Sequence, residues 1–231
     1  MKIVVCLHAA APGGTPLTPN DVEALRLAMA LAGEHQITAL LAGTQEEDAP
    51  LEAACAAGVD RAARITGESF AAADFHTLGQ VLGSAIVTLD AELILIGAHA
   101  DTEGLGALSA SVARHMGAPH LANIETLEII DQPPLRLAVT VHGGGRKRRL
   151  GVGLPAVLSV ARGSAHPARA TSERPPRDPA TIETLALFDP EVTLIRRRTE
   201  ILGSSAKSDR ETRVVASAPE LIAGLTQARH R

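Results

Sequence analysis

One short stretch of the sequence combines residue types that could bind an anion. Residues 97–119, GAHADTEGLGALSASVARHMGAP, follow the apolar run AELILI and turn small, polar and acidic before a helical pattern begins. Gly104 and Gly106 leave the first turn of that helix bare, so its free backbone N–H groups could hold a phosphate. Asp101 and Glu103 would repel a phosphate, and both also suit the cap of a helix. Nucleotide binding and plain helix capping therefore both stay open.

Two other strand ends carry residues that would share one crevice with this stretch. In an open parallel sheet, ligands bind outside the carboxyl ends of the strands. A loop histidine at His8 and strand-to-loop turns at Gly43 and Gly97 are the structural alternatives to a binding role. No catalytic residue is assigned, and an adenine nucleotide is the expected occupant. The predicted cofactor-binding set is His8, Ala9, Gly43, Thr44, Gly97, Asp101, Thr102, Glu103, Gly104 and Gly106.

Several motif matches lack the context that their chemistry needs. Residues 151–156, GVGLPA, satisfy a dinucleotide-binding pattern, but a strand-like run follows Pro155 where a helix is required. Residues 142–145, HGGG, match an oxyanion loop, yet the chain has no G-x-S-x-G elbow. The nine histidines show no metal-binding spacing, and no P-loop is present. These patterns disfavour a metal site and a nucleotide hydrolase or ligase.

Composition limits the function further. The chain has 231 residues, of which 45% are hydrophobic, and a net charge of −4, so it is globular and has no general nucleic-acid-binding surface, although residues 146–149 and 196–198 are basic. Three Phe and no Trp or Tyr leave little to stack on a flavin ring, so this chain alone is not expected to hold a flavin. We expect no membrane insertion and no signal peptide. Cys6 and Cys55 suit buried positions in a reducing compartment, which predicts a cytoplasmic location.

Alternating strand and helix patterns must position the crevice. Thr18 is the expected N-cap of the first helix, with Pro19 at its first position, Asp21 three residues after the cap and Gly33 at its end. This alternation predicts an α/β fold, with an open, mainly parallel sheet, helices on both faces and a Rossmann-like, adenine-nucleotide-binding architecture. The expected strands are 2–7, 37–43, 62–65 and 91–97, and the further helices are 48–57, 72–89 and one that buries Leu105, Leu108 and Val112.

The second half of the chain reads differently. The runs 123–130, 135–141, 146–152 and 156–160 are separated by turn residues and predict antiparallel strands that include a hairpin. Residues beyond 162 are rich in Pro, Arg, Ser and Ala and predict an extended arm. A terminal amphipathic helix would bury Leu221, Ile222 and Leu225 against another surface. The expected domains are an α/β domain at 1–162 and an arm with a docking helix at 163–231.

Five segments in the same order resemble the β subunits of electron transfer flavoproteins. KIVVCLH resembles the first strand of that family, LTPNDVEALRLAMAL its N-P-x-D-x-x-A-L helix start, and ELILIGAHA its L-I-L-x-G-x-Q-A strand end. RRLGVGLPAVLSVARGSAHP is similar to its hairpin and L-P-A segment, and VVASAPELIAGL to its final strand and docking helix. The resemblance implies one half of a heterodimer, whose α-like partner carries FAD and which accepts electrons from a flavin dehydrogenase.

Three departures from the family pattern bear on ligand and partner. The acidic signature that binds AMP, or a second flavin, corresponds to ADTEGLGAL, with Ala107 at its glutamine position. AMP, a second flavin and an empty crevice therefore stay open. Arg148 stands where the family has an acidic residue, and Ser172, in PARATSERPP, stands where it presents a leucine to its dehydrogenase. The small, polar ADTEG turn and the RKRRL hairpin resemble those of a subgroup linked to the catabolism of dimethylglycine and other N-methylated glycines.

One alternative function of another class stays open. A stand-alone adenine-nucleotide-binding sensor, similar to universal stress proteins, would use the same kind of sheet and form a homodimer. The phosphate-binding G-x-x-G-x(9)-G-[ST] pattern of such proteins is missing from this sequence. The sensor also leaves the hairpin, the arm and the terminal helix without a role.

Overall fold

A computed structural model describes residues 1–9, 14–31, 35–67, 70, 73–98, 107–130, 136–143, 146–161 and 182–186. All of them belong to the unit Met1–Arg198. The helices are α1 (Pro19–Ala30), α2 (Ala49–Ala57), α3 (Phe75–Thr88) and α4 (Leu108–Met116), with a short 3-10 helix, η1 (Gln45–Glu47). The strands are β1 (Lys2–Cys6), β2 (Gln36–Ala42), β3 (Arg61–Ile65), β4 (Leu93–Gly97), β5 (His120–Ile130), β6 (Arg136–Gly143), β7 (Arg146–Gly153), β8 (Ala156–Val160) and β9 (Glu183–Leu185).

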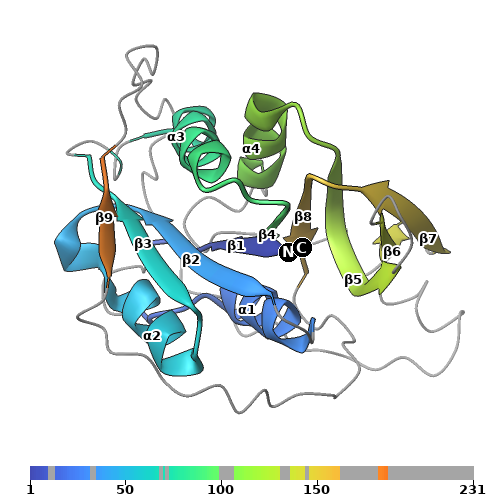
Figure 1. Ribbon diagram of the computed structural model, residues 1–231, viewed down its shortest axis with the longest axis horizontal. Coiled ribbons are helices and arrows are strands. Elements are labelled where there is room, and N and C mark those ends of the chain that lie inside the picture. Colours follow the sequence, from blue (N-terminus) through green and yellow to red (C-terminus); the bar gives the residue numbers. More distant parts are fainter. Residues whose placement is uncertain are drawn as a thin grey trace, which may run out of the picture. The chain divides into compact units, whose positions relative to one another are not determined.

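Within the described residues, the strands form one sheet in the order β7-β6-β5-β8-β4-β1-β2-β3-β9. The neighbouring pairs β5-β8, β8-β4, β4-β1, β1-β2, β2-β3 and β3-β9 are parallel. The pairs β5-β6 and β6-β7 are antiparallel. Helices α1 and α2 cover one face and α3 and α4 cover the other (Figure 1). The predicted α/β class, its mainly parallel open sheet and its antiparallel hairpin are confirmed.

Local sequence signals explain where the helices begin and end. The hydroxyl of Thr18 accepts a hydrogen bond from Asp21 N over 3.1 Å, and Pro19 opens α1, as predicted. Helix α1 ends at Ala30, before the predicted stop at Gly33, which lies outside the described residues. Helix α2 ends at Ala57, and its C-cap is Gly58, whose φ of 92° favours glycine.

The prediction that residues 156–160 form an antiparallel strand is wrong. Strand β8 runs parallel to both β4 and β5 and lies between them. All five of its residues are buried, which is typical of a central strand covered on both faces. Only Leu154 and Pro155 separate it from β7, and three Cα–Cα steps span at most about 11 Å. The antiparallel strands must therefore curl back toward the centre of the sheet.

A short strand also lies inside the segment that the sequence predicts as an arm. Residues Glu183–Leu185 form β9, which pairs in parallel with β3 and extends the sheet beyond it. The expected boundary at residue 162 stays a prediction. The predicted terminal helix, with Leu221, Ile222 and Leu225, falls outside the described residues and stays a prediction.

Candidate functional site

The sheet has a topological switch point between β1 and β4. From β1 the chain proceeds to β2 and β3 on one side, then returns to place β4 on the other side. Open α/β sheets bind ligands in the crevice at the carboxyl ends of such strands. His8 and Ala9 follow β1, and Gly97 ends β4, so the fold brings these three predicted residues to the switch point.

The remaining predicted residues divide into two groups. Gly43 and Thr44 follow β2, which neighbours β1, so they lie at the same edge one strand away from the switch point. The acidic stretch between β4 and α4 lies outside the described residues, so the roles predicted for it stay predictions. It contains Asp101, Thr102, Glu103, Gly104 and Gly106.

His8 is held by a buried carboxylate that the sequence did not assign to the site. Its Nδ1 lies 2.8 Å from Asp21 Oδ1, and its backbone N–H donates to Asp21 Oδ2 over 3.3 Å. The Asp21 side chain is fully buried, and that of His8 is only 10% exposed. The backbone of Asp21 takes part in the cap of α1, while its side chain turns toward the end of β1. From the sequence alone Asp21 is an ordinary first-turn acid of a helix, so no sequence signal marks it as the partner of His8.

Gly97 allows α1 to approach the end of β4 closely. A Cβ atom at residue 97 would lie 2.8 Å from Asp21 Oδ1 and 2.9 Å from the Cβ of Asn20. Real Cβ atoms do not come so close to such neighbours, so only glycine fits here without movement. The first turn of α1 occupies the space that a side chain at this strand end would need.

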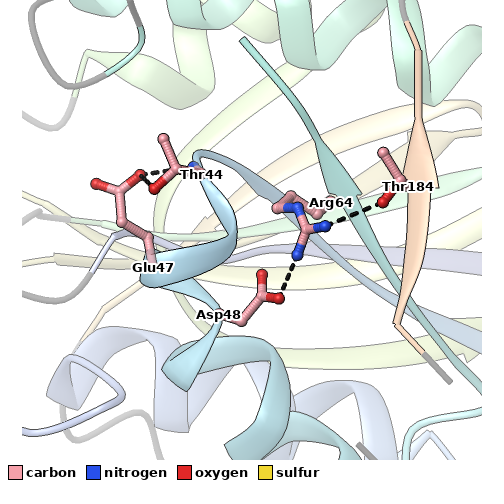
Figure 2. Close-up of polar contacts among 5 residues, drawn as sticks. All are labelled: Thr44, Glu47, Asp48, Arg64 and Thr184. Atoms are coloured by element: carbon pink, nitrogen blue, oxygen red, sulfur yellow. Dashed lines mark hydrogen bonds and ion pairs between the residues drawn. The ribbon is translucent and has the colours of Figure 1, made fainter. Parts of the chain in front are cut away.

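The Gly43-Thr44 pair performs a local capping role. The carboxylate of Glu47 accepts hydrogen bonds from Thr44 N over 2.8 Å and from the Thr44 hydroxyl over 3.3 Å (Figure 2). A Cβ at Gly43 would lie 2.8 Å from Glu47 Oε2, so the glycine makes room for this carboxylate. The polar groups of Thr44 are thus used to start η1 in this structure.

A buried arginine links the start of α2 to the edge strand β9. Arg64 on β3 is 8% exposed, and its guanidinium donates to Asp48 Oδ2 and, over 3.0 Å, to the hydroxyl of Thr184 on β9 (Figure 2). Within the described residues, Arg64 Nε and Asp48 Oδ1 are buried without a hydrogen-bond partner. This cluster was not predicted from the sequence, because an arginine is rarely buried and its partners Asp48 and Thr184 lie far from it along the chain.

A second arginine of β3 also binds β9. Arg61 donates to both carboxylate oxygens of Glu183, over 3.1 and 2.7 Å. These hydrogen bonds lower the pKa of Glu183 and raise that of Arg61. Arg61 therefore holds β9 by an ion pair with Glu183, and Arg64 holds it by a partly buried hydrogen bond to Thr184.

The hairpin carries its basic residues on an exposed edge strand. Lys147 pairs with Glu125, and Arg149 with Glu128, each over 2.6 Å. Arg148, which the sequence marks as a departure from the family pattern, is exposed on β7 and forms no ion pair with any described residue. Ser172 lies outside the described residues.

The described residues offer neither a reactive thiol nor a metal site. Cys6 and Cys55 are buried, as predicted, and the pKa of Cys6 is raised first by burial and then by the charge of Asp21. A buried thiol of this kind is a poor nucleophile. Among the described residues, no three His, Cys, Asp or Glu side chains could hold a metal ion together, and no helix is both long and apolar enough to span a membrane.

Comparison with known proteins places this architecture in one family. A family model described as the electron transfer flavoprotein domain matches residues 7–189, which include every described element after β1. The chain is 24% identical over 115 residues to the electron transfer flavoprotein subunit beta of Clostridium acetobutylicum, which covers 49% of this chain and 44% of that protein.

A second relative matches over a longer region. The chain is 24% identical over 169 residues to the electron transfer flavoprotein subunit beta of Methylophilus methylotrophus, which covers 72% of this chain and 64% of that protein. The matched regions span less than two thirds of either relative. The family match covers most of the chain and includes three of the five segments that resemble the family, whereas KIVVCLH begins before it and VVASAPELIAGL lies beyond it. The chain therefore belongs to the electron transfer flavoprotein family, among relatives that are β subunits.

Proposed function

We propose that this chain is the β subunit of a cytoplasmic, heterodimeric electron carrier and is not itself an enzyme. Its α-like partner would hold most of an FAD, whose isoalloxazine ring supplies the redox chemistry. The observation that carries this proposal is the family match over residues 7–189, which includes every described strand of the sheet except β1. The near absence of aromatic residues, with three Phe and no Trp or Tyr, supports assigning the flavin ring to the partner.

The described residues fit a nucleotide held by hydrogen bonds better than one held by a phosphate cradle. Gly43 and Gly97 leave no open space, because the carboxylates of Glu47 and Asp21 fill it. The switch point instead offers backbone groups and the imidazole of His8. We therefore propose an adenine nucleotide, AMP in the first instance, as the occupant of this crevice, with the residues between β4 and α4 as its second wall.

The electron donor that we propose is a flavin dehydrogenase of the dimethylglycine type. The ADTEG turn and the RKRRL hairpin, which resemble the dimethylglycine-linked subgroup, support this choice. Ser172 stands where the family presents a leucine, and Arg148 stands where it has an acid. Arg148 is exposed on the edge strand β7, as a contact with another protein requires. A changed pair of contact residues favours a donor other than the usual acyl-CoA dehydrogenase.

Co-expression with a candidate α-like chain tests the carrier. The tagged β chain is purified, and the co-purifying protein, the visible absorption spectrum and the released nucleotides are measured. A second chain with about one FAD per heterodimer is the expected result, and reduction of that flavin by a dimethylglycine dehydrogenase would establish the donor. A colourless homodimer that carries ATP would overturn the proposal in favour of a nucleotide sensor.

The predicted terminal helix allows a second test of the heterodimer. Replacing Leu221 and Leu225 by Asp should weaken co-purification of the α-like chain, because the predicted apolar face would become charged. Val87, which is 60% exposed on α3, is the matched control, since Val87→Asp adds a charge at an already solvated position. Equal co-purification of the tail variant and the control would remove the tail from the interface.

A further inference from the structure

The edge strand β9 has little apolar contact with the rest of the sheet. It consists of Glu183–Leu185 and pairs with β3 along one of its edges. Ile182 packs against the core cluster that includes residues of α1 and α2, and Leu185 packs against the cluster that includes residues of α3 and α4. Both residues are only partly buried, so the attachment of β9 depends strongly on its polar contacts.

Two arginines of β3 make these polar contacts, one on each face of the sheet. Side chains alternate along a strand, so positions 61 and 64 point to opposite faces. Arg61 donates from Nε and Nη2 to the two carboxylate oxygens of Glu183, over 3.1 and 2.7 Å. Arg64 donates from Nη2 to the hydroxyl of Thr184 over 3.0 Å and from Nη1 to Asp48 Oδ2 (Figure 2). The partly exposed arginine thus forms a two-point pair, whereas the buried arginine divides its donors between β9 and the start of α2.

This division leaves the buried pair incompletely bonded. Among the described residues, the donor Arg64 Nε and the acceptor Asp48 Oδ1 are both buried without a hydrogen-bond partner. The two side chains are only 10% and 13% exposed, and a buried polar group without a partner is unfavourable. A guanidinium and a carboxylate can form two parallel hydrogen bonds, as Arg61 and Glu183 do. With β9 in place, Arg64 and Asp48 form only one.

We propose that β9 is a releasable strap, and that Arg64 is its latch. When β9 leaves β3, the guanidinium of Arg64 turns away from the Thr184 hydroxyl and forms a two-point pair with both oxygens of Asp48. The bond to Thr184 is then replaced by a second bond to Asp48, so release costs far less free energy than opening a central strand. The strap is a property of the fold and does not depend on which ligand or partner the chain binds.

Amide hydrogen exchange at residues 183–185 of the full-length chain tests the latch. In Asp48→Asn, the amide oxygen can still accept from Arg64, but the amide nitrogen cannot accept the second bond that stabilises the released strap. Losing that bond from the released state should slow exchange at β9 about 10-fold. The same substitution should lower the urea midpoint of global unfolding, because a buried guanidinium loses its counter-charge. A local gain in protection together with a global loss of stability is the expected signature.

Thr184→Val is the opposite change on the same latch. Valine keeps the β-branched shape of threonine and removes the acceptor of Arg64, so exchange at β9 should become about 3- to 10-fold faster. Thr184 is exposed, so this variant should fold even if Asp48→Asn does not. A crystal structure of Thr184→Val should show Arg64 donating to both oxygens of Asp48. Glu128→Ala, which removes an exposed ion pair with Arg149, is the matched control and should leave exchange at β9 unchanged.

Four results would overturn the latch. Faster exchange at β9 in Asp48→Asn would mean that Asp48 only orients Arg64 toward Thr184. Equal shifts in Thr184→Val and Glu128→Ala would mean that β9 follows global stability. A one-point contact between Arg64 and Asp48 that persists in the Thr184→Val structure would exclude the turn of the guanidinium. An internal water that joins Arg64 Nε to Asp48 Oδ1 in a wild-type crystal structure would show that the pair is already fully bonded with β9 in place.

Discussion

Gly97 and Asp21 lie so close together that a Cβ on residue 97 would be 2.8 Å from Asp21 Oδ1. The same carboxylate lies 2.8 Å from His8 Nδ1. One oxygen atom of Asp21 therefore connects the end of β4 with the end of β1. The first turn of α1 therefore packs closely against the end of β4 and pairs with the histidine that follows β1, and the two strands are also hydrogen-bonded in the sheet.

Gly97→Ala should destabilise the fold and disturb this connection. The added methyl group meets Asn20 backbone carbon at 3.2 Å as well as the Asp21 carboxylate, so α1 must shift. Overpacking of this kind costs about 1–3 kcal/mol. Urea unfolding measures the loss, and Gly151→Ala on β7 is the control, because nothing lies within 4 Å of a Cβ there. Equal effects of the two substitutions would show that Gly97 is not tightly packed.

His120 should make stability depend on pH in the weakly acidic range. Burial lowers the pKa of His120 from its ordinary value of 6.5, and its Nε2 lies 3.0 Å from the Ser109 hydroxyl. Below pH 6.5 the unfolded chain then binds the proton more readily than the folded chain, so stability falls as the pH is lowered toward the folded pKa. His120→Gln should remove this part of the pH dependence in denaturant titrations. An NMR titration midpoint at or above 6.5 would contradict the prediction.

Glu183 should contribute stability at neutral pH that is lost in acid. Hydrogen bonds from Arg61 lower its pKa below the ordinary 4.5, so the contribution is present above pH 4.5 and disappears as the pH falls through the folded pKa. The Glu183 side chain is 45% exposed, which limits the effect to about 0.2–1 kcal/mol. Glu183→Gln should therefore lower stability at pH 7, and the difference from the wild type should shrink in acid and in high salt. A difference that stays constant with pH would exclude this ion pair as its cause.

Local signals in the sequence were sufficient for the elements that depend on near neighbours. The letters TPND predict the start of α1 because cap, proline and first turn lie within four residues. The apolar run before Gly97 likewise predicts β4. The direction of β8 could not be found in this way, because turn residues on either side of AVLSV do not say which distant strand it joins. Its unbroken burial is a consequence of that long-range choice.

The sequence predicted which strand ends the candidate residues follow, but it did not predict the side-chain contacts that these residues make. The fold brings His8, Ala9 and Gly97 to one switch point, as the alternation of strands and helices predicts. The partner of His8 was missed because Asp21, 13 residues away, also satisfies the pattern of a helix start. The contact between Arg64 and Thr184 joins residues 120 positions apart, and no local pattern reports such a contact.

The buried pair of Arg64 and Asp48 predicts a large effect when only one partner is removed. The side chains are 10% and 13% exposed, so Asp48→Ala leaves a buried guanidinium without its carboxylate. Breaking a buried pair in this way costs about 3–5 kcal/mol, whereas replacing both partners by apolar residues is often close to neutral. The double variant Arg64→Met with Asp48→Ala should therefore recover much of the stability that Asp48→Ala loses.

An exposed pair provides the scale for this comparison. Arg149 and Glu128 form a similar contact at 66% and 61% exposure, and Glu128→Ala should cost no more than about 1 kcal/mol. Unfolding free energies of Asp48→Ala, Arg64→Met, the double variant and the wild type give the coupling between Arg64 and Asp48. A small cost for Asp48→Ala, or a double variant that is less stable than either single change, would mean that the hydroxyl of Thr184 and internal water, and not Asp48, compensate the charge of Arg64. Because Arg64 also binds β9, the same variants should expose whether this edge strand loosens when the pair is broken, which amide hydrogen exchange at Glu183–Leu185 measures.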